Sequence, residues 1–105
     1  MRLKQSDLDA IIGSIDALLE LREAKLYLFG SRTNDFLRGG DIDLLMVCRE
    51  QDVATVMDKK YFLLASIKER IGDQKIDLAI CSPSKLLSDP FFRSIIDEAV
   101  LLHSW

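Results

Sequence analysis

The chain has 105 residues, of which 49% are hydrophobic and 30% charged, with a formal net charge of −3. This length is typical of one domain with a single core, and the composition excludes a wholly disordered chain. Because the balance is acidic, no chain-wide positive field attracts nucleic acid, and direct DNA binding is not expected.

We expect the protein in the cytoplasm and not in a membrane. The opening MRLKQSDLDA lacks the apolar core of a signal peptide, and no apolar run approaches the ~20 residues of a membrane span. Two cysteines, Cys48 and Cys81, are too few for a disulfide framework. Each follows an apolar run, so we expect reduced thiols at neighbouring strand ends, with a bridge between them as the alternative.

The first predicted element is an amphipathic helix over about residues 6–23. Ser6 followed by Asp9 resembles a capping box at its start. Its apolar positions fall on one helical stripe, which consists of Leu8, Ile11, Ile12, Ile15, Leu18 and Leu19. A short strand is expected over 25–29, and a helical turn followed by a loop over 31–40.

Two more strands are predicted over 42–48 and 75–80, with a long helix between them that ends at Gly72. Tyr61-Phe62 is expected to pack along this helix. After the third strand, Pro83 should open a short helix or turn, and Asp89-Pro90 has the pattern of an N-cap followed by proline at the first helical position. The last helix is then expected to reach His103, and Trp105 to be frayed or bound by a partner. This order of elements predicts a small α/β domain.

Alternation along the strands places three aspartates on one face of the sheet. Asp41 and Asp43 are two residues apart and point the same way, and Asp77 lies opposite the apolar row of its own strand. If the apolar rows pack on helices, the three carboxylates converge on the uncovered side and repel one another. Two Mg²⁺ ions would remove this repulsion and suit phosphoryl chemistry. The alternative is that each aspartate is a solvated strand-edge residue.

Gly30-Ser31 supplies a candidate phosphate site upstream of these aspartates. Glycine at a strand end lets the backbone approach a ligand closely. The serine hydroxyl and the free N–H groups of the following turn form an anion site. Arg32 either adds positive charge there or is an exposed arginine at a helix start.

With these residues in place, the sequence resembles the minimal nucleotidyltransferases (MNT) of the polymerase-beta superfamily. The shared pattern is a strand, Gly30-Ser31, nine intervening residues, Asp41-Ile42-Asp43, and Asp77 on a later strand. The gap is one residue shorter than in the minimal group, a difference expected in the loop at 38–40. The resemblance implies one domain over 1–105 with an α/β (α+β) fold, in which helices pack on one face of a small mixed sheet and the metal site lies on the other.

The resemblance also implies an activity, which is transfer of AMP from ATP to a hydroxyl with release of pyrophosphate. Carried over by position, Asp41 and Asp43 would bind both Mg²⁺ ions. Asp77 would bind the catalytic ion and help to deprotonate the acceptor. Gly30, Ser31 and Arg32 would hold the triphosphate.

The short chain leaves little surface with which to select a small acceptor alone. In the minimal family the usual partner is a HEPN-domain protein, often an RNase toxin, which implies an antitoxin that AMPylates this toxin in a hetero-oligomer. Two alternatives stay open. One is a binding module that sequesters the toxin without catalysis, and the other is an enzyme that adenylylates a small molecule in a pocket shared across a homodimer.

Overall fold

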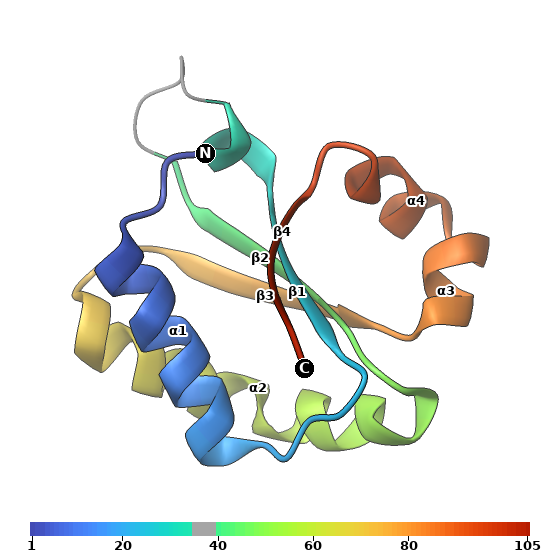
Figure 1. The fold of residues 1–105 in the computed structure, drawn as a ribbon, viewed down its shortest axis with the longest axis horizontal. Helices are drawn as coiled ribbons and strands as arrows, with labels where there is room; N and C mark the ends of the chain where they lie inside the picture. Colours follow the sequence, from blue (N-terminus) through green and yellow to red (C-terminus); the bar gives the residue numbers. More distant parts are fainter. Residues whose placement is uncertain (35–39) are drawn as a thin grey trace.

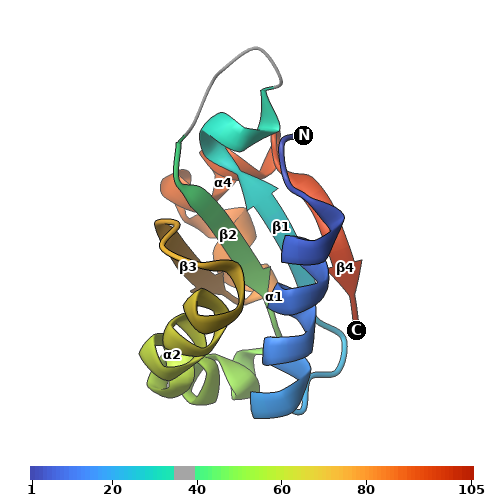
Figure 2. The same cartoon turned by 90° about the vertical axis from the view of Figure 1, so that its left-hand side faces the viewer.

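A four-stranded sheet forms the middle of the computed structural model, which describes residues 1–34 and 40–105. The strands are β1 (Lys25–Phe29), β2 (Ile42–Val47), β3 (Ile76–Cys81) and β4 (Val100–Ser104). They lie in the order β3-β2-β1-β4, so that β3 and β4 are the two edges (Figure 2). β1 pairs antiparallel with β2 and β4, whereas β2 and β3 are parallel, and the sheet is therefore mixed.

One face of the sheet is covered by the long helices α1 (Gln5–Leu18) and α2 (Glu50–Ile71) (Figure 1). The main core lies between them and the sheet, as the alternation predicts. It includes Ile11 and Ile15 of α1, Leu63 and Ile67 of α2, and Leu26, Leu28, Ile42, Leu44, Met46, Ile76, Leu78 and Ile80 of the strands. The strand residues that alternate with these therefore have their side chains on the opposite face of the sheet.

The boundaries of α1 differ from the prediction at both ends. The helix begins at Gln5, and its N-cap residue Lys4 makes no side-chain capping bond. The predicted capping box is wrong, because Asp9 instead accepts a hydrogen bond from Gln5 Nε2 at 2.9 Å. The helix ends at Leu18 because Leu19 is extended and buried, which turns the chain toward β1.

The end of α2 agrees with the sequence. Gly72 follows it with φ +86°, and its N–H bonds to the carbonyl of Lys68. Tyr61 and Phe62 do not pack along this helix, since they are 78% and 70% exposed. α2 therefore shows large apolar side chains to solvent.

Two short helices pack on the opposite face of the sheet, at the side away from α1 (Figure 1). α3 (Pro83–Ser88) is capped by Ser82, and α4 (Pro90–Ile96) by Asp89, whose side chain accepts from the N–H of Phe91. A second apolar cluster forms beneath them from Leu45, Val47 and Cys81, with Tyr27, Phe29, Ala79, Leu86, Phe92, Ile95 and Ile96 packed against it.

The predicted helix to His103 is wrong, because α4 ends at Ile96 and β4 follows. The segment from Val100 pairs with β1, so the main-chain groups of β1 are bonded on both sides. Trp105 is not frayed. Its Nε1 donates to Asp16 Oδ1 at 2.7 Å, and its backbone N–H bonds to the carbonyl of Ala24.

The two cysteines lie where the sequence places them, at neighbouring strand ends. The N–H of Cys48 bonds to the carbonyl of Cys81 at 2.9 Å, and both thiols are free and buried. Among the described residues, no helix has the length and apolar character needed to cross a membrane.

Candidate functional site

Asp43 and Asp77 stand directly opposite each other on adjacent strands. The parallel register of β2 and β3 pairs their Cα positions. Both side chains belong to the face that α1 and α2 leave uncovered, since their neighbours Ile42, Leu44, Ile76 and Leu78 are in the main core. Two of the three predicted carboxylates are thus brought together by strand pairing.

The charge of Asp41 also reaches this pair. Burial raises the pKa of Asp43 above its ordinary value, and the negative charges of Asp41 and then Asp77 raise it further. An influence of this kind requires the three carboxylates to be near one another. The negative charges of Asp41 and Asp77 thus both act on the carboxyl group of Asp43.

Asp77 has partners of its own at the sheet edge. Its Oδ1 lies 3.2 Å from Nζ of Lys60, which belongs to α2, and its side chain is 70% exposed. Burial by itself would raise the pKa of Asp77. A hydrogen bond from the backbone N–H of Leu78 and the ion pair with Lys60 outweigh it, so that the pKa lies below its ordinary value. Asp77 is held ionised and turned toward Lys60.

The donor set fits a hard divalent cation. Asp41, Asp43 and Asp77 offer carboxylate oxygens. Burial first, and then the charges of the other two aspartates, raise the pKa of Asp43, and a cation would offset the effect of those charges. In residues 1–34 and 40–105, no three acidic, histidine or cysteine side chains already stand at metal-binding distance. The carboxylate of Asp77 is engaged in an ion pair with Lys60, which would compete with such a cation.

The glycine-serine turn lies against these carboxylates. Gly30 begins a 3-10 helix, Gly30–Thr33, and has φ +78°. A Cβ on Gly30 would lie 2.6 Å from Oδ2 of Asp43, and a Cβ on Gly40 would collide with Oγ of Ser31. The backbone of the turn therefore approaches Asp43 as closely as only glycine permits. The close approach of Gly40 was missed from the sequence, although a glycine next to the aspartates was a usable signal.

Arg32 is placed differently from the prediction. Its guanidinium donates to the carbonyls of Gly40 and Arg2 and to Oε1 of Gln74, at 3.3, 3.0 and 3.1 Å. Arg2 returns the contact, since it donates to the carbonyls of Ser31 and Asn34. These bonds favour a role for Arg32 in fixing the turn rather than in contacting phosphate. Arg2 was missed, and nothing in its sequence context points to it.

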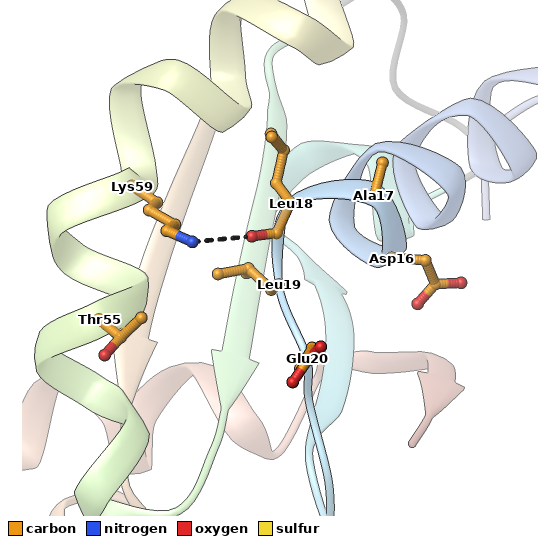
Figure 3. Close-up of a pocket in the computed structure, with 7 residues that line it drawn as sticks. All are labelled: Asp16, Ala17, Leu18, Leu19, Glu20, Thr55 and Lys59. Atoms are coloured by element: carbon orange, nitrogen blue, oxygen red, sulfur yellow. Dashed lines mark hydrogen bonds between the residues drawn. The ribbon is translucent and has the colours of Figure 1, made fainter.

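The loop expected over 31–40 begins with this turn, but residues 35–39, including most of the loop at 38–40, lie outside the described residues. Four cavities of about 330 to 610 Å³ open in the described part of the structure, and none of the three aspartates lines them. One of about 440 Å³ lies between the end of α1 and Thr55 and Lys59 of α2 (Figure 3). The three aspartates thus lie outside these cavities, and Asp77 is exposed at the sheet edge.

A mixed sheet with paired aspartates beside a glycine-serine turn defines the class of protein that transfers nucleotides. Residues 8–103 match the family model described as the nucleotidyltransferase domain, and the chain belongs to this family. Its fold is similar to the crystal structure of a candidate nucleotidyltransferase from Sulfolobus solfataricus. The TM-score is 0.58 and the identity 20%, with 99% of this chain and 92% of that one covered. No curated protein sequence matches the chain.

Proposed function

We propose that the protein is a Mg²⁺-dependent nucleotidyltransferase that moves AMP from ATP to a hydroxyl of a protein partner. We further propose that this partner is a HEPN-domain toxin, which the protein neutralises as its antitoxin in a hetero-oligomer. The observation that carries the transferase is the pairing of Asp43 with Asp77, with Asp41 in electrostatic reach and the Gly30 turn in contact. The partner and the antitoxin role rest on the resemblance to the minimal nucleotidyltransferases.

Different residues of the chain would have different roles in such a transfer. Gly30 and Ser31 would present the turn to the triphosphate, because a backbone without Cβ lets phosphate oxygens approach. Asp41, Asp43 and Asp77 would hold the two Mg²⁺ ions, which when bound supply positive charge for the attacking and leaving oxygens. Asp77 would accept the proton of the acceptor hydroxyl. The new bond joins the acceptor oxygen to the α-phosphorus, and pyrophosphate leaves.

A protein acceptor agrees with the openness of the site. Asp77 is 70% exposed on the edge strand β3, where a side chain of another protein can reach it without entering a cavity. Exposed Tyr61 and Phe62 of α2 follow directly after Lys60, the ion-pair partner of Asp77. Large apolar side chains on a surface favour contact with another protein. Cytoplasmic location is part of this proposal and accords with two free thiols.

The test uses the protein, its HEPN partner, Mg²⁺ and ATP labelled at the α-phosphate. We expect label on the partner with the wild type, and loss of at least a hundredfold in rate with Asp41→Asn or Asp43→Asn. Asp58→Asn, a change of an exposed aspartate on α2, is the matched control and should transfer normally. Neutralisation that survives in the two site variants would instead support sequestration. Turnover without any partner would support a small-molecule acceptor.

A further inference from the structure

We propose that Lys60 is a positioning residue that competes with the divalent cation for the carboxylate of Asp77. This inference rests on the proposed function, in which Asp77 is a metal ligand. Lys60 would keep the carboxylate of Asp77 turned to the sheet edge while the site is empty. It would release the carboxylate toward Asp43 when the cation and nucleotide bind.

The ion pair crosses from one face of the sheet to the other. α2 packs on the face that carries Leu78, whereas Asp77 belongs to the opposite face. Lys60 reaches Asp77 because β3 is an edge strand, so that a side chain can pass its outer side. The lysine is 23% exposed, and its Nζ lies 5.7 Å from the ring centroid of Tyr61. The partly buried side chain of Lys60 therefore places its positive charge beside Asp77 at the edge of the sheet.

The ion pair with Lys60 holds Asp77 in this orientation. Nζ of Lys60 lies 3.2 Å from Oδ1 of the carboxylate. In an edge strand, the main-chain groups of every second residue point away from the sheet. The carbonyls of Lys75 and Cys81 accept hydrogen bonds from residues in and just after β2, so the odd-numbered residues bond inward. The N–H of Leu78, an even-numbered residue, therefore points to the outer edge. Asp77 is thus turned toward the outer edge, and a cation that took Oδ1 as a ligand would have to displace Lys60 from it.

The pair contributes little to the stability of the fold. An ion pair whose carboxylate is largely exposed contributes little, because water screens the two charges. The lysine charge nevertheless contacts Asp77, and it would repel a doubly charged cation bound by the same carboxylate, because like charges a few ångströms apart repel even in water. The main consequence of Lys60 is therefore for cation affinity rather than for folding.

The experiment measures Mn²⁺ binding to the whole protein without nucleotide, from the electron paramagnetic resonance signal of free Mn²⁺. Lys60→Met should bind Mn²⁺ about threefold to tenfold more tightly than the wild type, because competitor and repulsive charge are both removed. Lys60→Arg retains a cation and should bind like the wild type. Lys59→Met is the matched control, because it removes the same charge from the next residue of α2. Lys59 donates to the carbonyl of Leu18 at the other side of the helix, and its removal should leave the affinity unchanged (Figure 3).

A double-mutant cycle separates competition for Asp77 from general repulsion. In an Asp77→Asn background, Lys60→Met should no longer tighten Mn²⁺ binding to the same extent, because the contested carboxylate is gone. The inference is overturned if Lys60→Met leaves the affinity unchanged or weakens it, or if the tightening persists in full with Asp77→Asn. It is also overturned if neither the wild type nor Lys60→Met binds Mn²⁺.

The transfer assay distinguishes failure of this inference from failure of the proposed function. Label transfer by the wild type, with equal Mn²⁺ affinity in Lys60→Met, overturns the role of Lys60 alone. Tighter Mn²⁺ binding in Lys60→Met without any label transfer supports competition at the cation site and contradicts the transferase. A thermal denaturation curve for each variant shows that the comparison is made between folded proteins.

Discussion

Gly30 leaves no room for a side chain beside Asp43. A Cβ at this position would lie 2.6 Å from Oδ2 of the aspartate, and the residue has φ +78°. The backbone of the turn therefore lies directly against one carboxylate oxygen of the neighbouring strand. Glycine is favoured here by the positive φ, and a Cβ would in addition displace the carboxylate of Asp43.

We predict that Gly30→Ala lowers the free energy of unfolding by about 1–3 kcal/mol through backbone strain and reduces ATP affinity at least tenfold. Gly72→Ala is the matched control. Gly72 also has positive φ, +86°, but a Cβ there meets nothing within 4 Å. It should show the loss of stability in chemical denaturation without the loss of ATP binding. Equal effects of both changes on ATP binding would contradict the role of the Gly30–Asp43 contact.

Asp43→Asn should make the protein more stable while removing its activity. Because burial, and then the charges of Asp41 and Asp77, raise the pKa of Asp43, the folded protein keeps this proton to higher pH than the unfolded chain does. Stability is therefore lost as the pH rises through the folded-state pKa, and the loss is complete at neutral pH. We expect a gain of about 0.5 kcal/mol for Asp43→Asn at pH 7, a small value because solvent screens the site.

This gain should shrink as the pH falls toward 3.8, the ordinary value for an aspartate. Asp77→Asn is the contrasting variant. The bonds from Leu78 and Lys60 lower the pKa of Asp77, so its charge adds stability at neutral pH, and this contribution is lost as the pH falls through the lowered pKa. Urea denaturation at several pH values should show no gain for Asp77→Asn. A gain of equal size for both variants would contradict these assignments.

Arg32→Lys should destabilise the turn. The planar guanidinium bonds to Gly40, Arg2 and Gln74 at once, and an ammonium group cannot reproduce this geometry. We expect a loss of about 1–2 kcal/mol in the free energy of unfolding, measured in urea. Arg22→Lys, at an exposed arginine, should be close to neutral. If Arg32→Lys keeps full stability and weakens ATP binding alone, Arg32 contacts phosphate after all.

The thiols of Cys48 and Cys81 should be unreactive in the folded protein. Burial, as the largest cause, raises the pKa of each to about 11. The reactive thiolate is therefore scarce at pH 8. A thiol reagent such as Ellman's reagent should modify both only after guanidinium denatures the protein. Ser88→Cys supplies an exposed thiol as the positive control. Fast modification of the folded wild type would contradict the burial of the pair.

The carboxylate face could be predicted because alternation in a strand is a local property. Asp41 and Asp43 share a face for any strand through Ile42, and the apolar rows decide which face meets the helices. The register between β2 and β3 could not be predicted from this local alternation. A shift of β3 by two residues would keep every side chain on its face but move Asp77 away from Asp43. Only pairing in three dimensions sets the two opposite.

The errors at the C-terminal part have a physical cause of the same kind. Phe92, Ile95 and Ile96 have helical spacing, and the apolar run that follows them fits either a helix or a strand. Pairing with β1, far away in the sequence, decides in favour of β4. Other contacts also join segments that are distant in the sequence, and no local sequence pattern predicts them. They are the bonds of Arg32 with Arg2 and Gln74 and the contact of Lys60 with Asp77.

The strand β1 takes its two neighbours from very different distances along the chain. Lys25 lies opposite Val47 on one side and opposite Ser104 on the other. Closing the larger loop costs more chain entropy, and pairings of this separation slow folding. The strand that leads into the Gly30-Ser31 turn thus completes its pairing only when β4, far along the chain, reaches it, and weakening β4 should reduce the rate of folding.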